Sequence, residues 1–305
     1  MGLGIKPSQD PVLLARATPY LHHFIQNAAL GRALIERHCK SPSKFELQSI
    51  RQVFGCWFIT LAQMSAHQPS HAHDLPISYY WSGDAIRSRS VSDVVLSGVV
   101  DVPAPPARLV ADWQRETSLR LGLEPGDVEA LPLPRARMRW PDYGRCVQAV
   151  SDWTHTLGLQ DVLVGSDLAL MACRGAKYHH DGAQYGGSAF CNLFLSEDKG
   201  LDLHFAATGH RIPLTRGMVV IFDTGQPHAV IDRNSAGFSV ADYPPERDCT
   251  QVFLTWELPM ENAHVAKALR IAFDMNRSTA LLLDDEQVWV NGRSVSVCPE
   301  SGRWS

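Results

Sequence analysis

Residues 217–233, GMVVIFDTGQPHAVIDR, contain two short apolar runs on either side of a Gly-Gln-Pro turn. Each run is rich in Val and Ile and has the length of a strand, and glycine and proline between them favour a reversal of the chain. The stretch therefore predicts two β-strands that meet at a turn, with His228 at the start of the second strand.

Short runs of the same kind recur from about residue 161 onward. Glycine, asparagine or aspartate separates them at intervals of about ten residues, which is typical of an antiparallel sandwich or jelly roll. The other runs are DVLVGSDLALMACRG (161–175), SAFCNLFLS (188–196), LDLHFAA (201–207), HRIPL (210–214) and TQVFLTWEL (250–258).

The segment before this β-rich part has helical periodicity instead. Ser43 and Glu46 form a capping box ahead of a run with the apolar spacing of a buried helix. Further helices are expected within 102–122 and 142–159. We therefore expect a helix-rich N-terminal portion, residues 1–160, that packs on a β core, residues 161–258.

A short third portion, residues 259–305, is expected to follow the β core. Residues 261–276 have the pattern of a helix, and residues 288–297 form a predicted hairpin with Asn291-Gly292 at its turn. The fold class predicted from all three portions is α+β.

The composition is that of a globular protein: of 305 residues, 45% are hydrophobic and 20% are charged. The formal net charge is −4 and no basic block occurs, which argues against a nucleic-acid partner. No apolar run is long enough for a membrane span, and the seven cysteines include no C-x-x-C pair that would suggest structural zinc. We expect a cytoplasmic location; the oligomeric state is left open.

A candidate metal site lies in KYHHDGAQYGG, residues 177–187. Alternate residues of a strand point to the same side, so His179 and Asp181 can converge while His180 points away. His228 is the best candidate for a third ligand. Two imidazoles and one carboxylate form a facial triad with open coordination positions, the arrangement of non-haem Fe(II) oxygenases.

From about residue 161 to 258 the chain resembles the double-stranded β-helix core of Fe(II)/2-oxoglutarate-dependent dioxygenases, which is jelly-roll and cupin-like. The resemblance rests on the H-x-D at 179–181, on the strand and turn pattern with R-G-x-V-x-x-F at 216–222, and on the histidine at 228, in that order. It covers about a third of the chain.

The resemblance implies three cofactors, namely Fe(II), 2-oxoglutarate as co-substrate, and O₂. It implies hydroxylation or desaturation of a small molecule, amino acid or peptide, with release of succinate and CO₂. Because Asp181 is retained, the resemblance argues against halogenation.

The family also places an arginine or lysine on the last core strand, where it pairs with the far carboxylate of 2-oxoglutarate. The usual position, about ten residues past the distal histidine, is Phe238 here. Arg247 is the preferred substitute, and Arg233 is the alternative. Asn192 and Tyr178 complete the predicted cofactor-binding set.

Alternatives to this interpretation remain. His204 and His210 could serve as ligands in a cupin-type site, and the protein could be a cupin-like metalloenzyme that does not use 2-oxoglutarate. It could also be a non-catalytic jelly-roll binding protein. A rival histidine cluster within 67–74, HQPSHAHD, is better explained as a solvated loop.

Overall fold

The computed structural model describes residues 75–305, which belong to one compact unit. The predicted capping box at Ser43 and the histidine cluster within 67–74 lie outside the described residues. Within 75–305 the fold consists mostly of antiparallel β-sheets with a few helices. None of the helices in this range combines the length and the apolar character needed to cross a membrane.

From β5 to β12 the strands alternate between two sheets, except that β8 and β9 are neighbours in one sheet. A six-stranded sheet has the order β3-β10-β7-β12-β5-β4, and a four-stranded sheet has the order β6-β11-β8-β9. The bounds are β3 (Val95–Val99), β4 (Val128–Leu131), β5 (Leu168–Cys173), β6 (Ala176–His179), β7 (Ser188–Phe194), β8 (Leu201–Phe205), β9 (His210–Pro213), β10 (Met218–Asp223), β11 (His228–Asp232) and β12 (Gln251–Pro259).

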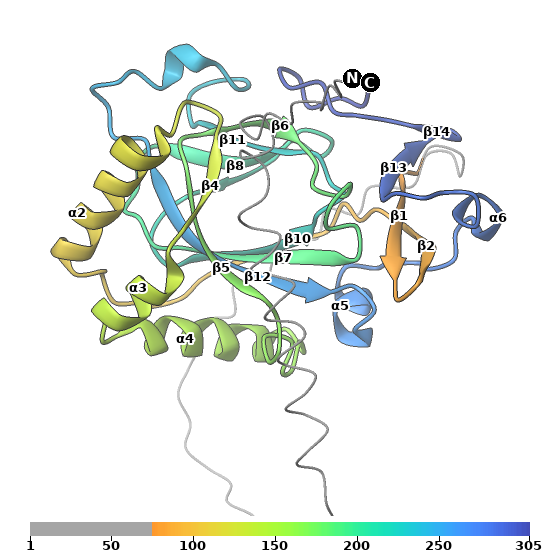
Figure 1. Cartoon of the computed structure of the whole chain (residues 1–305), viewed down its shortest axis with the longest axis horizontal. Helices are drawn as coiled ribbons and strands as arrows, with labels where there is room; N and C mark the ends of the chain where they lie inside the picture. Colours follow the sequence, from red (N-terminus) through yellow and green to blue (C-terminus); the bar gives the residue numbers. More distant parts are fainter. Residues whose placement is uncertain (1–74) are drawn as a thin grey trace, which may run out of the picture. The chain divides into compact units, whose positions relative to one another are not determined.

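The two sheets face each other across an apolar core. Phe194, Phe222 and Phe253 of the six-stranded sheet pack with Leu203 and Phe205 of the four-stranded sheet. Figure 1 shows the two layers, with β6, β11 and β8 above β7, β12 and β5. We call the side of the six-stranded sheet that faces the other sheet its inner face.

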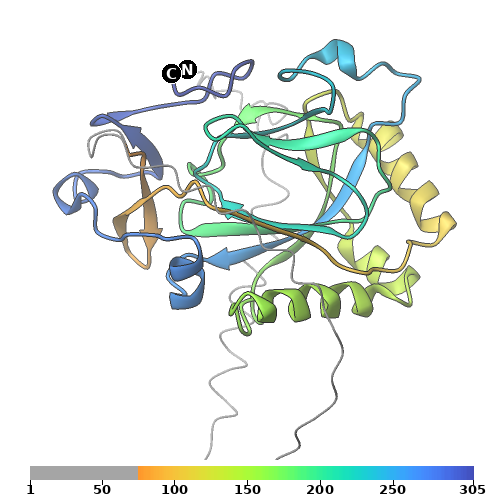
Figure 2. The ribbon, with the colours of Figure 1, turned by 180° about the vertical axis from the view of Figure 1, so that it is seen from behind.

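Helices cover the other face of the six-stranded sheet. These are α2 (Ala107–Arg115), α3 (Leu133–Arg139) and α4 (Tyr143–Thr156), with a π-helical extension of α2, η1 (Glu116–Leu121). Trp113 of α2 and Val150 of α4 share one buried cluster with Leu254 and Trp256 of β12. Figure 2 shows α4 along this face from behind. Both sides of the central strands are therefore largely buried, which explains why apolar residues predominate on both of their faces.

A smaller sheet with the order β14-β13-β1-β2 stands beside these layers. It joins β1 (Ile77–Ser82) and β2 (Ala85–Ser90) to the C-terminal hairpin of β13 (Gln287–Val290) and β14 (Arg293–Ser294). The remaining short helices are η2 (Val240–Asp242), α5 (Ala263–Ala268) and α6 (Arg277–Ala280).

Several elements predicted from the sequence are confirmed. Each β-rich run from 161 to 258 contains a strand, and helices occur within 102–122 and 142–159. The predicted hairpin turns at Asn291 and Gly292, which have φ values of 53° and 74°. These positive angles suit the turn that closes two-residue hairpins, and glycine adopts them at no steric cost.

Two expectations differ from the structure. The helix expected over 261–276 is much shorter, since α5 covers only Ala263–Ala268. Residues 77–99 form β1, β2 and β3 within a portion expected to be helix-rich. The difference arises because these strands are stabilised by partners that are distant in the sequence: β3 pairs with β10 and β1 pairs with β13.

A buried ion pair joins β2 to the end of β10. Arg89 and Asp223 are both fully buried, and the Arg89 guanidinium donates to both carboxylate oxygens, at 2.7 and 2.8 Å. Arg89 Nε also donates to the carbonyl of Gly186 at 2.7 Å, while Asp223 accepts from the backbone N–H groups of Ser92 and Gly225. The pair is thus hydrogen-bonded on nearly all sides, which compensates for the loss of water.

Arg89→Met is expected to lower the free energy of unfolding by about 3–5 kcal/mol, because it leaves Asp223 buried without its cation. Arg87→Met on the same strand is the matched control. The ion pairs of Arg87 with Glu261 and Asp274 are partly exposed, so this loss should stay below about 1 kcal/mol. Urea denaturation of both variants measures the difference, and equal losses would contradict the assignment.

Candidate metal centre

The pairing of β6 with β11 brings the predicted ligands together. His179, the last residue of β6, lies directly opposite His228, the first residue of β11. Asp181 follows β6 after one residue, and its backbone N–H donates to the carbonyl of Thr224 at 2.7 Å. The pairing of β6 with β11 therefore positions His179 and His228, and the backbone hydrogen bond to Thr224 positions Asp181.

The donor atoms of the triad surround a common point. His179 Nε2 lies 3.7 Å from Asp181 Oδ1, and His228 Nε2 lies 3.5 Å from Asp181 Oδ2. All three donor atoms lie within 4.8 Å of one another. The two nitrogen–oxygen separations are long for hydrogen bonds but close to the ~3.0–3.5 Å between neighbouring ligands of an ion bound at ~2.1 Å.

Backbone carbonyls set the orientation of both imidazoles. His179 Nδ1 lies 2.7 Å from the carbonyl of Lys177, and His228 Nδ1 lies 2.9 Å from the carbonyl of Gln226. A carbonyl only accepts, so each Nδ1 carries the proton and each Nε2 offers its lone pair to the shared space. Metal-binding histidines are oriented in this way in many proteins.

The electrostatics of the triad also suit a bound cation. Burial, together with nearby His179, holds the pKa of His228 well below its usual value, so its imidazole stays neutral. Burial raises the pKa of Asp181 despite the histidines around it. The Asp181 carboxylate is mostly buried, and it faces the lone pairs of two imidazole nitrogens. No positive charge in the triad compensates the carboxylate, and a divalent ion would provide that charge. The residues present therefore fit a metal ion with mixed N/O ligands.

Aromatic side chains form a wall beside the triad. The ring of Phe222 lies 4.8 Å from the ring of His228, and Phe190 lies 6.1 Å from Phe222. Tyr185 continues the wall, with its ring 5.1 Å from Phe190. Phe222 thus gives the triad one apolar neighbour, and Phe190 and Tyr185 extend the apolar surface away from it.

The strand register shows which residues share the inner face with this wall. Phe222, Phe190 and Glu257 are partners across β10, β7 and β12, so their side chains lie in one row. The next row on the same face contains Asn192 and Thr255. Asn192 Oδ1 and Thr255 Oγ1 are buried and have no hydrogen-bond partner. Buried polar atoms of this kind are rare, and they are available to a ligand between the sheets.

Glu257 is a titratable group that the sequence-based prediction did not include. Burial, and then the nearby carboxylate of Asp167, raise the pKa of Glu257 to about 7. Burial, and then the charges of Glu257 and Asp181, raise the pKa of Tyr185, so this tyrosine lies near both carboxylates. In the sequence, the two-residue spacing indicates only that Glu257 lies on the same face of its strand as Thr255. Which face points to the interior follows only from the strand register.

The structure does not bring the two predicted arginines to the triad. Arg247 pairs with Asp232 at 2.6 Å. Asp232 is the last residue of β11, whereas His228 is the first. Arg233 pairs with Asp198 and Asp202, at 2.9 Å in each case. β11 rises about 13 Å between its first and last residues, so neither guanidinium lies beside the metal centre. β12, with the sequence QVFLTWELP, contains no cation.

The remaining candidates are turned away from the triad. Tyr178 belongs to a cluster with Ala229 and Ile231 on the opposite face of the four-stranded sheet, and it bonds His204 there. His180 accepts from the N–H of Gly182, and its ring packs 5.5 Å from Trp304. Of the predicted cofactor-binding residues, only Asn192 lies on the inner face.

Comparisons with known proteins give structural matches alone. No protein-family model and no curated protein matches the sequence. A prolyl-4-hydroxylase from Pseudomonas putida is similar at 16% identity, with TM-score 0.32, over 54% of this chain and 92% of that chain. The viral collagen prolyl hydroxylase vCPH from Paramecium Bursaria Chlorella virus-1 is similar at 9% identity, with TM-score 0.34, over 65% and 98%.

The non-haem α-ketoglutarate-dependent epimerase SnoN from nogalamycin biosynthesis is similar at 14% identity, with TM-score 0.28, over 56% of this chain and 83% of that chain. α-Ketoglutarate is another name for 2-oxoglutarate.

Glu257 gives the stability a pH dependence. Its folded pKa of about 7 lies above the ordinary value of 4.5, so the folded state holds the proton more tightly than the unfolded state does. This stabilisation is complete below pH 4.5 and is lost as the pH rises to about 7, by up to about 3 kcal/mol.

Glu257→Gln should therefore flatten the pH dependence of the unfolding free energy between these limits. The exposed Glu246→Gln is the control and should leave the slope unchanged. Urea denaturation at several pH values measures the slopes. An unchanged slope in Glu257→Gln would contradict the raised pKa.

Proposed function

We propose that this protein is a non-haem Fe(II)-dependent oxygenase that uses 2-oxoglutarate as co-substrate. The observation that carries the proposal is the convergence of His179, Asp181 and His228 at one end of the paired strands β6 and β11. Two imidazoles and one carboxylate with open positions suit Fe(II) oxygenases.

The strand order supports the same class. From β5 to β12 the chain alternates between the two sheets, and β8 and β9 are the only neighbours of this series that lie in the same sheet. We infer a double-stranded β-helix, with residues 161–258 as its catalytic core. In this arrangement His179, Asp181 and His228 would hold the metal at one end of the two sheets, where a substrate could reach it.

The described residues supply positions and protons around the metal. Bound Fe(II) would supply the redox chemistry that activates O₂ for attack on a C–H bond, with 2-oxoglutarate as the electron source. The carbonyls of Lys177 and Gln226 hold the imidazoles in the tautomer that binds metal. The aromatic wall of Tyr185, Phe190 and Phe222 gives the triad an apolar neighbour on one side. In this proposal the reaction is a hydroxylation or desaturation of a small molecule, amino acid or peptide.

We infer that the far carboxylate of 2-oxoglutarate is anchored by a group other than Arg247 or Arg233, because both guanidinium groups are paired with aspartates. The Thr255 hydroxyl faces the interior without a partner and can donate a hydrogen bond to a carboxylate there, but it contributes no charge. The unpaired atom of Asn192 is Oδ1, which only accepts and therefore suits a donor group of the ligand. The lack of a cation on β12 favours a second candidate function. This candidate is a metalloenzyme that uses the same triad without 2-oxoglutarate.

Asp181→Ala is expected to abolish stoichiometric Fe(II) binding, because it removes one of three ligands. The loss should exceed the roughly 10–100-fold that outer partners of a metal site contribute. His180→Ala is the matched control, since this neighbouring imidazole packs on Trp304. Anaerobic metal analysis measures both variants. Equal iron content in Asp181→Ala and the parent would reject the metal centre.

Addition of 2-oxoglutarate to the anaerobic Fe(II) protein should produce a weak visible charge-transfer band. Thr255→Val should weaken the affinity about tenfold, the value of one hydrogen bond to a charged group. Arg247→Ala and Arg233→Ala should leave it unchanged, because both arginines pair with aspartates elsewhere. Iron binding without any band would reject 2-oxoglutarate and favour the second candidate.

A further inference from the structure

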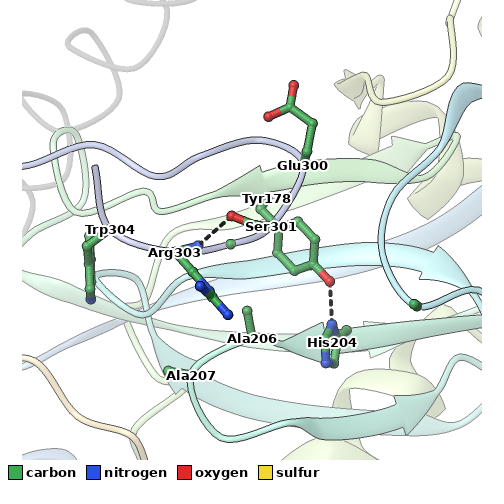
Figure 3. Close-up of a pocket in the computed structure, with 10 residues that line it drawn as sticks. Tyr178, His204, Ala206, Ala207, Glu300, Ser301, Arg303 and Trp304 are labelled. Carbon is green, nitrogen blue, oxygen red and sulfur yellow. Dashed lines mark hydrogen bonds between the residues drawn. The ribbon is translucent and has the colours of Figure 1, made fainter.

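A second cavity lies on the opposite side of the four-stranded sheet from the metal centre. Along β6, His179 points to the triad while Tyr178 points to the other face, where it packs with Ala229 and Ile231. The cavity has a volume of about 570 Å³, within the range of small-molecule sites. Its walls are Tyr178, His204, Ala206, Ala207, Ala236 and the C-terminal segment 300–304 (Figure 3).

The C-terminal segment is held firmly over this face. The N–H of Tyr178 donates to the carbonyl of Pro299, and the N–H of Cys298 donates to the carbonyl of Arg303 at 2.8 Å. Gly302 has a φ of 71°, and a side chain there would collide with Ala206 and Tyr178. This close approach requires glycine, so the cavity has a built wall.

One polar group of the cavity is a hydrogen-bonded pair of Tyr178, which is buried, and His204, and this pair has one donor that the mutual bond does not use. Tyr178 Oη lies 2.5 Å from His204 Nδ1. Burial and the nearby charge of Arg211 lower the pKa of His204, so its imidazole is neutral and has one N–H. Tyr178 has one O–H donor and neutral His204 has one N–H donor, and only one of these two donors forms the hydrogen bond between them. Whichever tautomer is present, one donor remains for a ligand.

Two charged residues, Glu300 and Arg303, line the cavity, and only Arg303 extends its side chain toward it. Figure 3 shows the Arg303 side chain extending toward Ala206, while the Glu300 carboxylate points away from the cavity. Glu300 accepts instead from Cys298 Sγ at 3.2 Å. Within residues 75–305, no acidic side chain lies within 4.0 Å of the Arg303 guanidinium. The cavity therefore offers donors and a cation, whose natural complement is an anionic acceptor.

We propose that this cavity binds a small organic acid, with its carboxylate on Arg303 and the Tyr178–His204 pair, and with a flat apolar body against Ala206, Ala207 and Trp304. The body suits this place because the alanines leave room and the indole provides an apolar surface. The site is separate from the metal centre, which opens on the other face of the same sheet. A ligand here contacts the residue that precedes His179, and it also contacts Trp304, which packs on His180.

Isothermal titration calorimetry of the full-length protein with benzoate tests this site, with benzamide as the neutral isostere. Benzoate should bind at least tenfold more tightly than benzamide, because only the carboxylate can pair with Arg303. Arg303→Ala should weaken benzoate binding at least tenfold. Arg293→Ala, which removes an exposed arginine from the C-terminal hairpin, is the matched control and should bind like the parent.

Two further variants locate the site. Ala207 is exposed at the edge of the cavity, so Ala207→Trp should block benzoate without disturbing the core. Asp181→Ala should retain benzoate binding, because the acid does not occupy the metal centre. The proposal is overturned if benzoate does not bind, if benzamide binds equally well, or if Arg303→Ala or Ala207→Trp binds like the parent. Loss of binding in Asp181→Ala would also overturn it and would place benzoate on the metal.

Discussion

The buried ion pair of Arg89 and Asp223 is the constraint on which the metal centre depends. Asp223 ends β10 and begins the turn that leads to His228, and Arg89 also holds the carbonyl of Gly186 in the loop after Asp181. Within the same turn, the Thr224 carbonyl accepts from the N–H of Asp181. One fully buried charge pair therefore fixes both chain segments that carry the triad, and it joins the small sheet to the large one.

The interior between the sheets changes in character along its length. Away from the metal it is closed by apolar side chains such as Phe194 and Phe253. Near the metal it contains a titratable acid, Glu257, and unpaired polar atoms on Asn192 and Thr255. Among the described residues, the groups named here offer hydrogen bonds to this interior and no positive charge. This condition limits which co-substrates and substrates can lie there.

The two predicted arginines show what sequence reasoning leaves out. Alternation and loop length made Arg247 the better anchor and Arg233 the alternative, but neither criterion accounts for competing partners. Asp198 and Asp202, on or before β8, and Asp232, at the end of β11, take up both guanidinium groups. These aspartates are distant from their partners in sequence or lie at a strand end, so only the tertiary structure reveals the ion pairs.

The sequence by itself determined the run of strands from β5 to β12, two of the helices, the hairpin turn and the three residues that converge at the candidate metal site. Hydrophobic alternation predicts strands and glycine predicts turns, and both are local properties of the sequence. Because alternate side chains of a strand share one face, the spacing of His179 and Asp181 is a local property too. Only the tertiary structure decided the register of Glu257 with Phe190, the strands before residue 100 and the cavity under the C-terminal segment. These features depend on contacts between distant parts of the chain, for which a single sequence has no local signal.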